Sequence, residues 1–201
     1  MPDIVIRGGT VIDGTGQPQR SADVAIDGNQ ITAVGSNISR GDREINAAGA
    51  LVMPGWVDVH THYDGQVTWD PYLTPSSWHG VTTAVFGNCG VGFAPVNSGT
   101  EDYLINLMEG VEDIPGSVLA EGMDFSWQTF PEYLDRVDAS PKVMDVAAQI
   151  PHGPLRFYVM GERGADHTVV PNHDEIETMG KIVEEALAVG YGLLPCVFVR
   201  H

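Results

Sequence analysis

The run Val81–Phe86 (VTTAVF) constrains the fold more than any other stretch, because nearly every residue in it is β-branched or apolar. A strand that is apolar on both faces needs cover on both, which is typical of a parallel sheet with helices outside it. Further strands are expected at 56–62, 143–150 and 193–199. Capping residues and helical spacing predict helices from Pro75, at 101–111, at 129–137 and between Asn172 and Gly190. This order predicts an α/β fold with a parallel sheet.

The segment before Pro54 has the pattern of a small all-β unit. Short alternating runs are expected to form strands at 3–7, 10–13, 22–26, 30–34 and 44–46. Asp27-Gly28-Asn29 is a hairpin signal between two of these runs. Because the runs hold few large apolar residues, the sheet needs another layer to pack against. We therefore expect two domains, residues 1–53 and residues 54–201.

Composition excludes several classes of partner. The chain has 201 residues and a formal net charge of −17, with 10 Lys+Arg against 27 Asp+Glu. Nucleic acids and anionic membranes attract basic surfaces, so neither is an expected partner. No apolar run is long enough to span a bilayer, and the first residues lack a signal-peptide core, which favours a cytoplasmic protein. The two cysteines, Cys89 and Cys196, do not suggest a disulfide framework.

Two strand ends carry residues that can bind a metal. His60 and His62 close the strand expected at 56–62, and side chains two apart on a strand point to one face. Cys89 closes the next strand, 27 residues (89 − 62) after His62, close to the roughly 30 residues of one βαβ unit. Neighbouring parallel strands would place the three side chains together, and imidazole with thiolate suits zinc. The alternatives are histidines that cap the strand and a cysteine that packs as a small apolar residue.

Longer motifs around these residues resemble the D-aminoacylase branch of the amidohydrolase superfamily, whose members hydrolyse N-acyl-D-amino acids. The motifs are His60-Thr61-His62-Tyr63-Asp64-Gly65-Gln66, His79-Gly80-Val81-Thr82-Thr83 and Gly87-Asn88-Cys89-Gly90-Val91-Gly92-Phe93-Ala94-Pro95. The opening runs at 12–16, 31–35 and 52–55 are similar too, and the resemblance extends to about Gly190.

The resemblance implies a (β/α)8 barrel of TIM type that carries a small β-sandwich built from both chain ends. Residues 1–53 would form the N-terminal part of the sandwich, and residues 54–201 the first half of the barrel. Cys89 falls on the position that holds zinc in this branch. His60 and His62 fall on strand-one ligand positions that form a second, weaker metal site, so one or two zinc ions are expected.

The same resemblance implies the chemistry. Bound metal would lower the pKa of a water molecule, which attacks the amide of a small N-acylated amino acid. His152, at the end of the third expected strand, is a candidate for substrate binding. A loop histidine that is bonded to its surroundings is the alternative for this residue.

The chain departs from the family in length. A complete barrel takes about 250 residues, and 148 residues (201 − 53) follow the β unit. The family's other zinc-binding histidines, its catalytic aspartate and the basic residue that grips the substrate carboxylate would lie beyond residue 201, as would the C-terminal half of the sandwich. His167, His173 and His201 do not stand at the matching strand ends. We therefore expect a fragment of a longer enzyme, with little or no activity alone. The sequence after Gly190 departs from the family in the way that a shift of the reading frame would produce.

Three functions remain open at this stage. The first is hydrolysis of linear amides, and the second is a non-catalytic remnant that at most binds zinc. The third is a cyclic amidase of the hydantoinase type, which shares the His-x-His motif. That type employs a lysine on the fourth strand, and Lys142 and Lys181 stand elsewhere.

Overall fold

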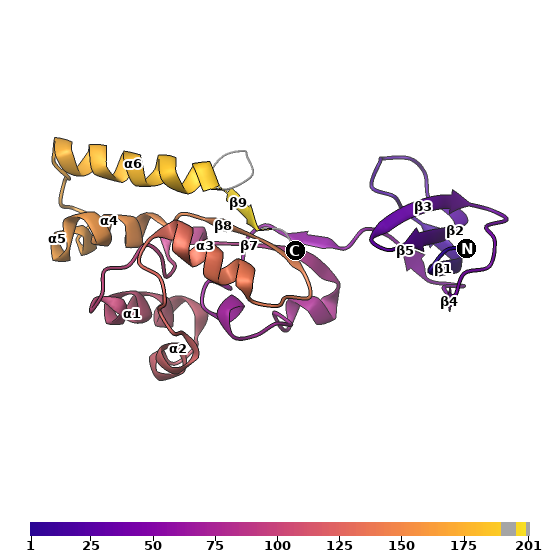
Figure 1. Ribbon diagram of the computed structural model, residues 1–201, viewed down its shortest axis with the longest axis horizontal. Coiled ribbons are helices and arrows are strands. Elements are labelled where there is room, and N and C mark those ends of the chain that lie inside the picture. Colours follow the sequence, from indigo (N-terminus) through magenta and orange to yellow (C-terminus); the bar gives the residue numbers. More distant parts are fainter. Residues whose placement is uncertain (190–195, 200–201) are drawn as a thin grey trace. The chain divides into compact units, whose positions relative to one another are not determined.

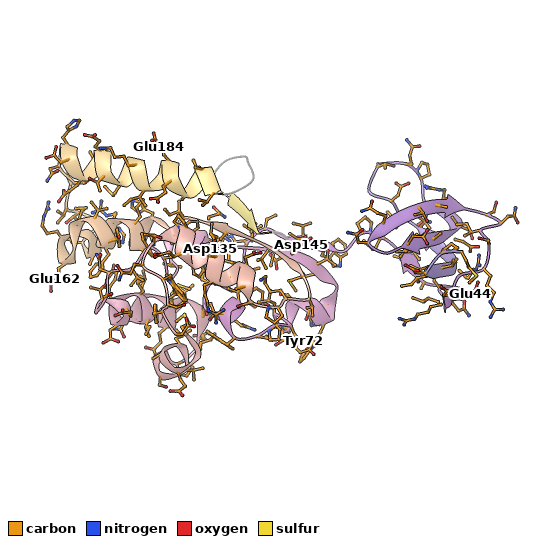
Figure 2. The ribbon with its side chains drawn as sticks, in the orientation of Figure 1. Glu44, Tyr72, Asp135, Asp145, Glu162 and Glu184 are labelled. Atoms are coloured by element: carbon orange, nitrogen blue, oxygen red, sulfur yellow. The ribbon has the colours of Figure 1, made fainter. Side chains whose placement is uncertain are left out.

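The structure is a computed structural model that describes residues 1–189 and 196–199 (Figure 1). The chain divides into two compact units, Met1–Gly55 and Trp56–His201. Both units expose acidic side chains, which places the charge surplus on the surface. The labelled examples are Glu44, Asp135, Asp145, Glu162 and Glu184 (Figure 2). Among the described residues, no helix combines the length and the apolar character that crossing a membrane requires.

The first unit is a five-stranded sheet in the order β3-β2-β1-β4, with β5 also paired to β1. Its strands are β1 (Ile4–Val11), β2 (Arg20–Asp27), β3 (Gln30–Gly35), β4 (Arg43–Asn46) and β5 (Leu51–Val52). β2 is antiparallel to β1 and β3, whereas β4 and β5 run parallel to β1. The predicted hairpin between β2 and β3 is confirmed.

The gap expected between the strands at 3–7 and 10–13 is instead an irregularity within β1, at Gly8 and Gly9. The register against β2 shifts between Ile6 and Gly9, and Gly8 has a positive φ of 65°. The glycines therefore bend the strand without ending it, as in a β-bulge. The buried cluster on this sheet consists of Val11, Ala22 and Val24, so its core is small, as the sequence predicts.

The second unit contains a four-stranded sheet in the order β6-β7-β8-β9. Its strands are β6 (Trp56–Asp58), β7 (Val81–Phe86), β8 (Asp145–Gln149) and β9 (Cys196–Val199). The first three are parallel, as predicted. β9 is antiparallel to β8, so the prediction of a parallel fourth strand is wrong. A parallel strand would enter the sheet at the amino end of β8, whereas Cys196 pairs with Gln149 at its carboxyl end.

The prediction of a buried strand over 56–62 is also wrong. β6 ends at Asp58, and the exposed fractions of Trp56 and Val57 are 59% and 58%, although successive side chains point to opposite faces. These side chains are exposed because β6 lies at the edge of the sheet. Among the described residues, only β7 pairs with it. By contrast, β8 lies between two strands, and Val146 and Ala147 are fully buried.

Helices pack against this sheet and against one another (Figure 1). The 3-10 turns are η1 (Gln66–Thr68), η2 (Ser76–His79) and η3 (Asn88–Gly90). The α-helices are α1 (Glu101–Glu112), α2 (Gly116–Gly122), α3 (Phe130–Ala139), α4 (His152–Met160), α5 (Glu162–Ala165) and α6 (His173–Val189). The capping boxes predicted from Thr129 with Glu132, and from Asn172 with Glu175, are both present.

The helix that was predicted from Pro75 is only the 3-10 turn η2. Pro75 occupies the N-cap position and offers no side-chain acceptor. Thr74, whose side chain could otherwise cap a helix that begins at Pro75, directs both its N–H and its hydroxyl to the carboxylate of Asp70, at 2.9 and 3.0 Å.

The core of the second unit is aromatic and lies around β7 and α3. The largest fully buried side chains include Trp127, Tyr133, Phe86, Phe93 and Phe130. α6 packs on α3 and α4 but buries only Ala186, although its apolar residues recur at helical spacing. Ile176 and Leu187 on this helix are exposed. The core therefore depends on the loops and helices between β7 and β8.

Candidate metal centre

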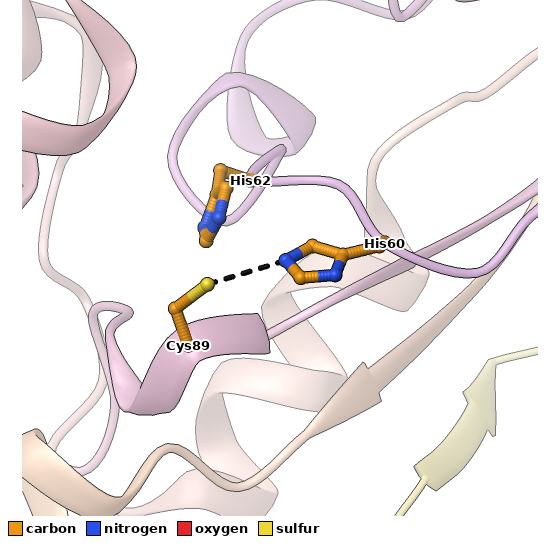
Figure 3. Close-up of side chains that lie close together, drawn as sticks. All are labelled: His60, His62 and Cys89. Carbon is orange, nitrogen blue, oxygen red and sulfur yellow. Dashed lines mark hydrogen bonds between the residues drawn. The ribbon is translucent and has the colours of Figure 1, made fainter.

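Three side chains that follow neighbouring strands meet at one point of the second unit (Figure 3). His60 and His62 lie in the segment after β6, and Cys89 lies in η3, directly after β7. Each residue offers one ligand atom, and these atoms lie within 4.8 Å of one another. The Nε2 atom of His60 is 3.2 Å from the Sγ atom of Cys89. The structure thus brings together the three residues that the sequence singled out.

The residue between the two histidines fixes their orientation. Thr61 donates its N–H and its hydroxyl to the carbonyl oxygen of Val85, at 2.9 and 2.8 Å. The chain therefore stays alongside β7 after β6 has ended. On either side of Thr61, the side chains of His60 and His62 both point toward Cys89 (Figure 3). The rings of His60 and His62 meet edge to face, with centroids 5.6 Å apart.

The turn that carries Cys89 has an unusual backbone. Gly87, Cys89 and Gly90 have positive φ values of 80°, 56° and 74°. A Cβ atom on Gly87 would lie 2.1 Å from the backbone oxygen of Gln149, so only glycine fits there. A positive φ at Cys89 is strained for a residue with a side chain and needs support from its surroundings.

Asn88 supplies that support. Its side-chain amide donates to the carbonyl oxygens of Thr61 and Val85, at 3.2 and 2.9 Å. Its side-chain oxygen accepts from the side-chain amide of Gln149 at 2.9 Å. One side chain thus ties together the segment after β6, strand β7 and the carboxyl end of β8. The sequence analysis named Asn88 only as one residue of a family motif and gave it no role. The glycines on either side of the Asn88-Cys89 pair were the signal in the sequence for a turn with positive φ angles.

Asp64 is a buried carboxyl group that sequence reasoning also missed. It is 2% exposed, and its Oδ2 atom has no hydrogen-bond partner. Burial raises its pKa to about 7, an effect that the backbone N–H of Gly87 partly offsets. A Cβ atom on Gly92 would lie 2.7 Å from its Oδ1 atom, so Asp64 fills the space that this glycine leaves open. Asp64 therefore packs the histidine segment against the loop that follows Cys89.

The three residues fit a zinc ion by chemistry and by distance. Two ligand atoms of one tetrahedral zinc ion lie about 3.5 Å apart when the metal–ligand distances are near 2.1 and 2.3 Å. The Nε2 atom of His60 lies 3.2 Å from the Sγ atom of Cys89, and all three ligand atoms lie within 4.8 Å of one another, so the separations in the cluster are close to this value. The Nδ1 atom of His62 is buried without a partner. Burial, followed by the charge of His60, lowers the pKa of His62, which favours the neutral imidazole that binds metals. His60 and Cys89 are exposed, so the site is open to small molecules.

His152 is the first residue of α4 and borders the Cys89 turn. A Cβ atom on Gly90 would lie 3.5 Å from the Cβ atom of His152. Its ring stacks with that of His167, with centroids 6.3 Å apart and planes 18° apart. Burial lowers the pKa of His152, followed by the charges of Arg156 and His167.

The remaining residues that were weighed lie elsewhere or cannot be placed. Lys142 donates to the carbonyl oxygens of Val137 and Ser140, and Lys181 pairs with Glu177 at 2.7 Å. His173 begins α6. His201 lies outside the described residues.

The comparison with protein families decides the relationship. A profile described as the amidohydrolase family matches residues 43–195. The chain belongs to the amidohydrolase family. This membership relates the chain to hydrolases that act on carbon–nitrogen bonds other than peptide bonds.

Individual relatives narrow the similarity within the amidohydrolase family. D-aminoacylase of Alcaligenes xylosoxydans xylosoxydans is 33% identical over 94% of this chain and 36% of its own length. A solved structure of D-aminoacylase, whose binuclear metal centre was studied, is 36% identical with a TM-score of 0.78 over 94% of this chain and 37% of that chain. The structure of N-acyl-D-glutamate deacylase of Bordetella bronchiseptica was solved with zinc and a phosphonate inhibitor. It is 29% identical with a TM-score of 0.69, and the match covers 93% of this chain and 36% of that chain. The chain thus spans about a third of the length of these relatives.

Proposed function

We propose that this chain forms part of the metal centre of a zinc-dependent hydrolase of linear amides whose substrates are N-acyl-D-amino acids. The observation that carries the proposal is the convergence of His60, His62 and Cys89 within 4.8 Å. Two imidazoles and a thiolate suit zinc. The similarity to D-aminoacylase and to N-acyl-D-glutamate deacylase supports the substrate class. We assign the second unit to the first half of a (β/α)8 barrel and the first unit to part of a β-sandwich.

The residues of the chain take distinct roles in this proposal. Cys89 holds the ion as a thiolate from a turn that Asn88 fixes, and His60 and His62 hold it from the segment after β6. Bound zinc supplies an activated water molecule and polarises the amide carbonyl. His152 borders the Cys89 turn on the side of α4 and contacts the substrate. No described residue is assigned as the general base, so we expect the isolated chain to bind zinc and to show little turnover.

A second candidate is a zinc-binding remnant without catalytic activity. The exposed side chains of β6 favour this second candidate. Because β6 is an edge strand, no further strand or helix among the described residues encloses the metal cluster on that side. A cyclic amidase of the hydantoinase type is less well supported. Lys142 and Lys181 both bond to groups away from the cluster.

Cobalt substitution tests the metal site, because a thiolate bound to Co²⁺ gives a charge-transfer absorption band in the near ultraviolet. We expect this band in the chain and its loss in Cys89→Ser, while His173→Asn, which alters an exposed histidine on α6, keeps it. A chain that binds Co²⁺ without a thiolate band would contradict the proposed site.

The zinc-loaded chain is then given N-acetyl-D-methionine and, separately, a hydantoin. Release of free amino acid from the first compound identifies a deacylase, and ring opening of the second identifies a cyclic amidase. Slow zinc-dependent release from the first compound favours the hydrolase over the remnant. A thiolate band without turnover of either compound supports the zinc site and is expected both of the remnant and of an inactive part of a hydrolase.

A further inference from the structure

The helix α6 carries more apolar residues than its packing uses. It contacts α3, α4 and β9. Its half-buried and buried apolar residues include Met179, Ile182 and Ala186, which recur at a spacing of three and four residues. Ile176 and Leu187 are apolar as well, but their exposed fractions are 54% and 40%. A second apolar surface therefore lies on this helix, next to the packed one.

This second surface is a straight stripe, which we call the open stripe and define as Ile176, Gly180, Val183 and Leu187. Their spacing of four, three and four residues keeps them on one line along a helix of 3.6 residues per turn. The same geometry places the open stripe about a quarter turn around α6 from the packed residues. Gly180 has open space where a side chain would begin, since no atom lies within 4 Å. Such a line, with a gap near its middle, is the surface that one helix presents to another.

The outer flank of the open stripe is acidic. Glu177 and Glu184 each follow a residue of the stripe directly, so both border it on the side away from the packed residues. Glu184 projects outward from α6 (Figure 2). Glu177 pairs with Lys181 at 2.7 Å, but both side chains are exposed, and such pairs contribute little. In the part of the chain that the structure describes, Glu184 forms no ion pair.

These charges decide which kind of helix fits the open stripe. A second copy that packs antiparallel would set Glu177 and Glu184 against the same two side chains of its partner, where like charges repel. A parallel copy would set them against the apolar residues on the other flank, where a charge loses its water. Lysine or arginine at the flanking positions of a different helix would instead pair with both glutamates. Charge complementarity therefore favours a basic partner.

We propose that the open stripe of α6 binds an amphipathic helix of another polypeptide, which carries large apolar side chains along one face and lysine or arginine beside them. A large side chain of the partner enters the gap at Gly180, and the basic residues meet Glu177 and Glu184. A single pair of helices forms a small interface, so the contact is expected to be transient. The inference goes beyond the proposed function, because it uses no residue of the metal cluster.

Two synthetic helical peptides that differ only in flanking charge test the proposal. Both carry leucine along one face, and one has lysine and the other glutamate beside it, since these two residues have similar helix propensity. Fluorescence anisotropy measures the binding of each labelled peptide to the full chain. We expect the lysine peptide to bind about tenfold more tightly, and this preference to shrink as salt is added. Equal affinities, or no binding of either peptide, would overturn the proposal.

Two neighbouring glutamates provide matched charge variants. Glu184→Gln removes a charge from the flank of the open stripe, and Glu185→Gln removes the same charge from the opposite side of α6. The first change should weaken binding of the lysine peptide about threefold without weakening that of the glutamate peptide. The second should change neither. Equal weakening by both variants would show that the acidic chain attracts the peptide without a site, and would overturn the proposal.

Two exposed apolar residues near the end of α6 provide the second matched pair. Leu187 is 40% exposed and belongs to the open stripe, whereas Val189 is 51% exposed and lies away from it. Leu187→Ser should weaken both peptides about fivefold, because each buries this side chain. Val189→Ser should weaken neither, and the same loss in both variants would contradict the assignment of the stripe.

Sedimentation of the chain alone tests the other occupant. We expect a monomer, because two acidic flanks repel each other. A dimer that Leu187→Ser abolishes and Val189→Ser retains would identify a second copy as the occupant of the open stripe and overturn the proposal of a basic partner.

Discussion

The two sides of the metal cluster are built in different ways. On the cysteine side, which comprises β7, η3 and β8, the strands are covered and the Asn88 side chain fixes the turn through three hydrogen bonds. On the histidine side, which comprises residues 56–62, Trp56 and Val57 are exposed and β6 lies at the edge of the sheet. The bonds from Thr61 to Val85 hold this segment to its neighbour.

This difference shows how one site can combine a rigid ligand and adaptable ligands. A ligand that is held in place before binding loses little conformational freedom when it meets a metal or a substrate. Ligands that follow an uncovered edge strand lose more, so each contributes less to the affinity. We therefore expect Cys89 to dominate metal binding by this chain and the histidines to adjust their positions to the ion.

The largest effect is expected on metal affinity. Cys89→Ser should weaken Co²⁺ binding about a thousandfold, or about 4 kcal/mol, because the ligand on the fixed turn is lost. His60→Asn should weaken it only about tenfold, or about 1.4 kcal/mol. Titration followed by visible absorption measures both, with His173→Asn as the control. Equal losses in the two variants would remove the distinction between the two sides.

Gly87→Ala tests the rigidity of the cysteine side. The new Cβ atom would lie 2.1 Å from the backbone oxygen of Gln149, at a φ of 80°. Strain and overpacking together should lower the free energy of unfolding by about 3 kcal/mol. Gly99→Ala is the matched control, because it has a similar φ of 85° and no atom within 4 Å. It should cost only about 1 kcal/mol, and urea unfolding of both variants would show whether the close contact matters.

Asn88→Ala removes the side chain that links the two sides. It loses three hydrogen bonds, so the free energy of unfolding should fall by about 2 kcal/mol. Asn97→Ala, which loses one bond of 2.9 Å to the carbonyl oxygen of Tyr158, should cost about 1 kcal/mol. The Co²⁺ affinity of Asn88→Ala should fall as well, and that of Asn97→Ala should not. An unchanged affinity in Asn88→Ala would mean that the Cys89 turn keeps its shape without this link.

The smallest effect is expected on the exposed edge. Val57→Thr should change the free energy of unfolding by less than about 0.5 kcal/mol, because Val57 is 58% exposed. Val146→Thr places the same hydroxyl in a fully buried position of β8 and should cost about 2 kcal/mol. Thermal unfolding compares the two variants directly. A large loss in Val57→Thr would show that the edge is covered in solution.

Local sequence signals predicted most of the secondary structure. The capping boxes of α3 and α6 and the parallel strands β6 to β8 follow from patterns within a few residues. The errors at β6 and β9 have a common cause, because they concern neighbours in space. Burial of β6 and the direction of β9 depend on which strand lies beside each one, and apolar sequence alone does not specify that neighbour.

The sequence by itself determined which side chains could bind a metal and that they follow neighbouring strands, since residue type and spacing are local properties. Only the tertiary structure decided how they are held. The glycine at 87 is required by a backbone oxygen 62 residues later (149 − 87), and Asn88 joins three chain segments. Likewise, the pairing of His152 with His167 depends on Arg156 binding the loop between α5 and α6. Such contacts are absent from the sequence pattern because they form only when separate segments are packed together.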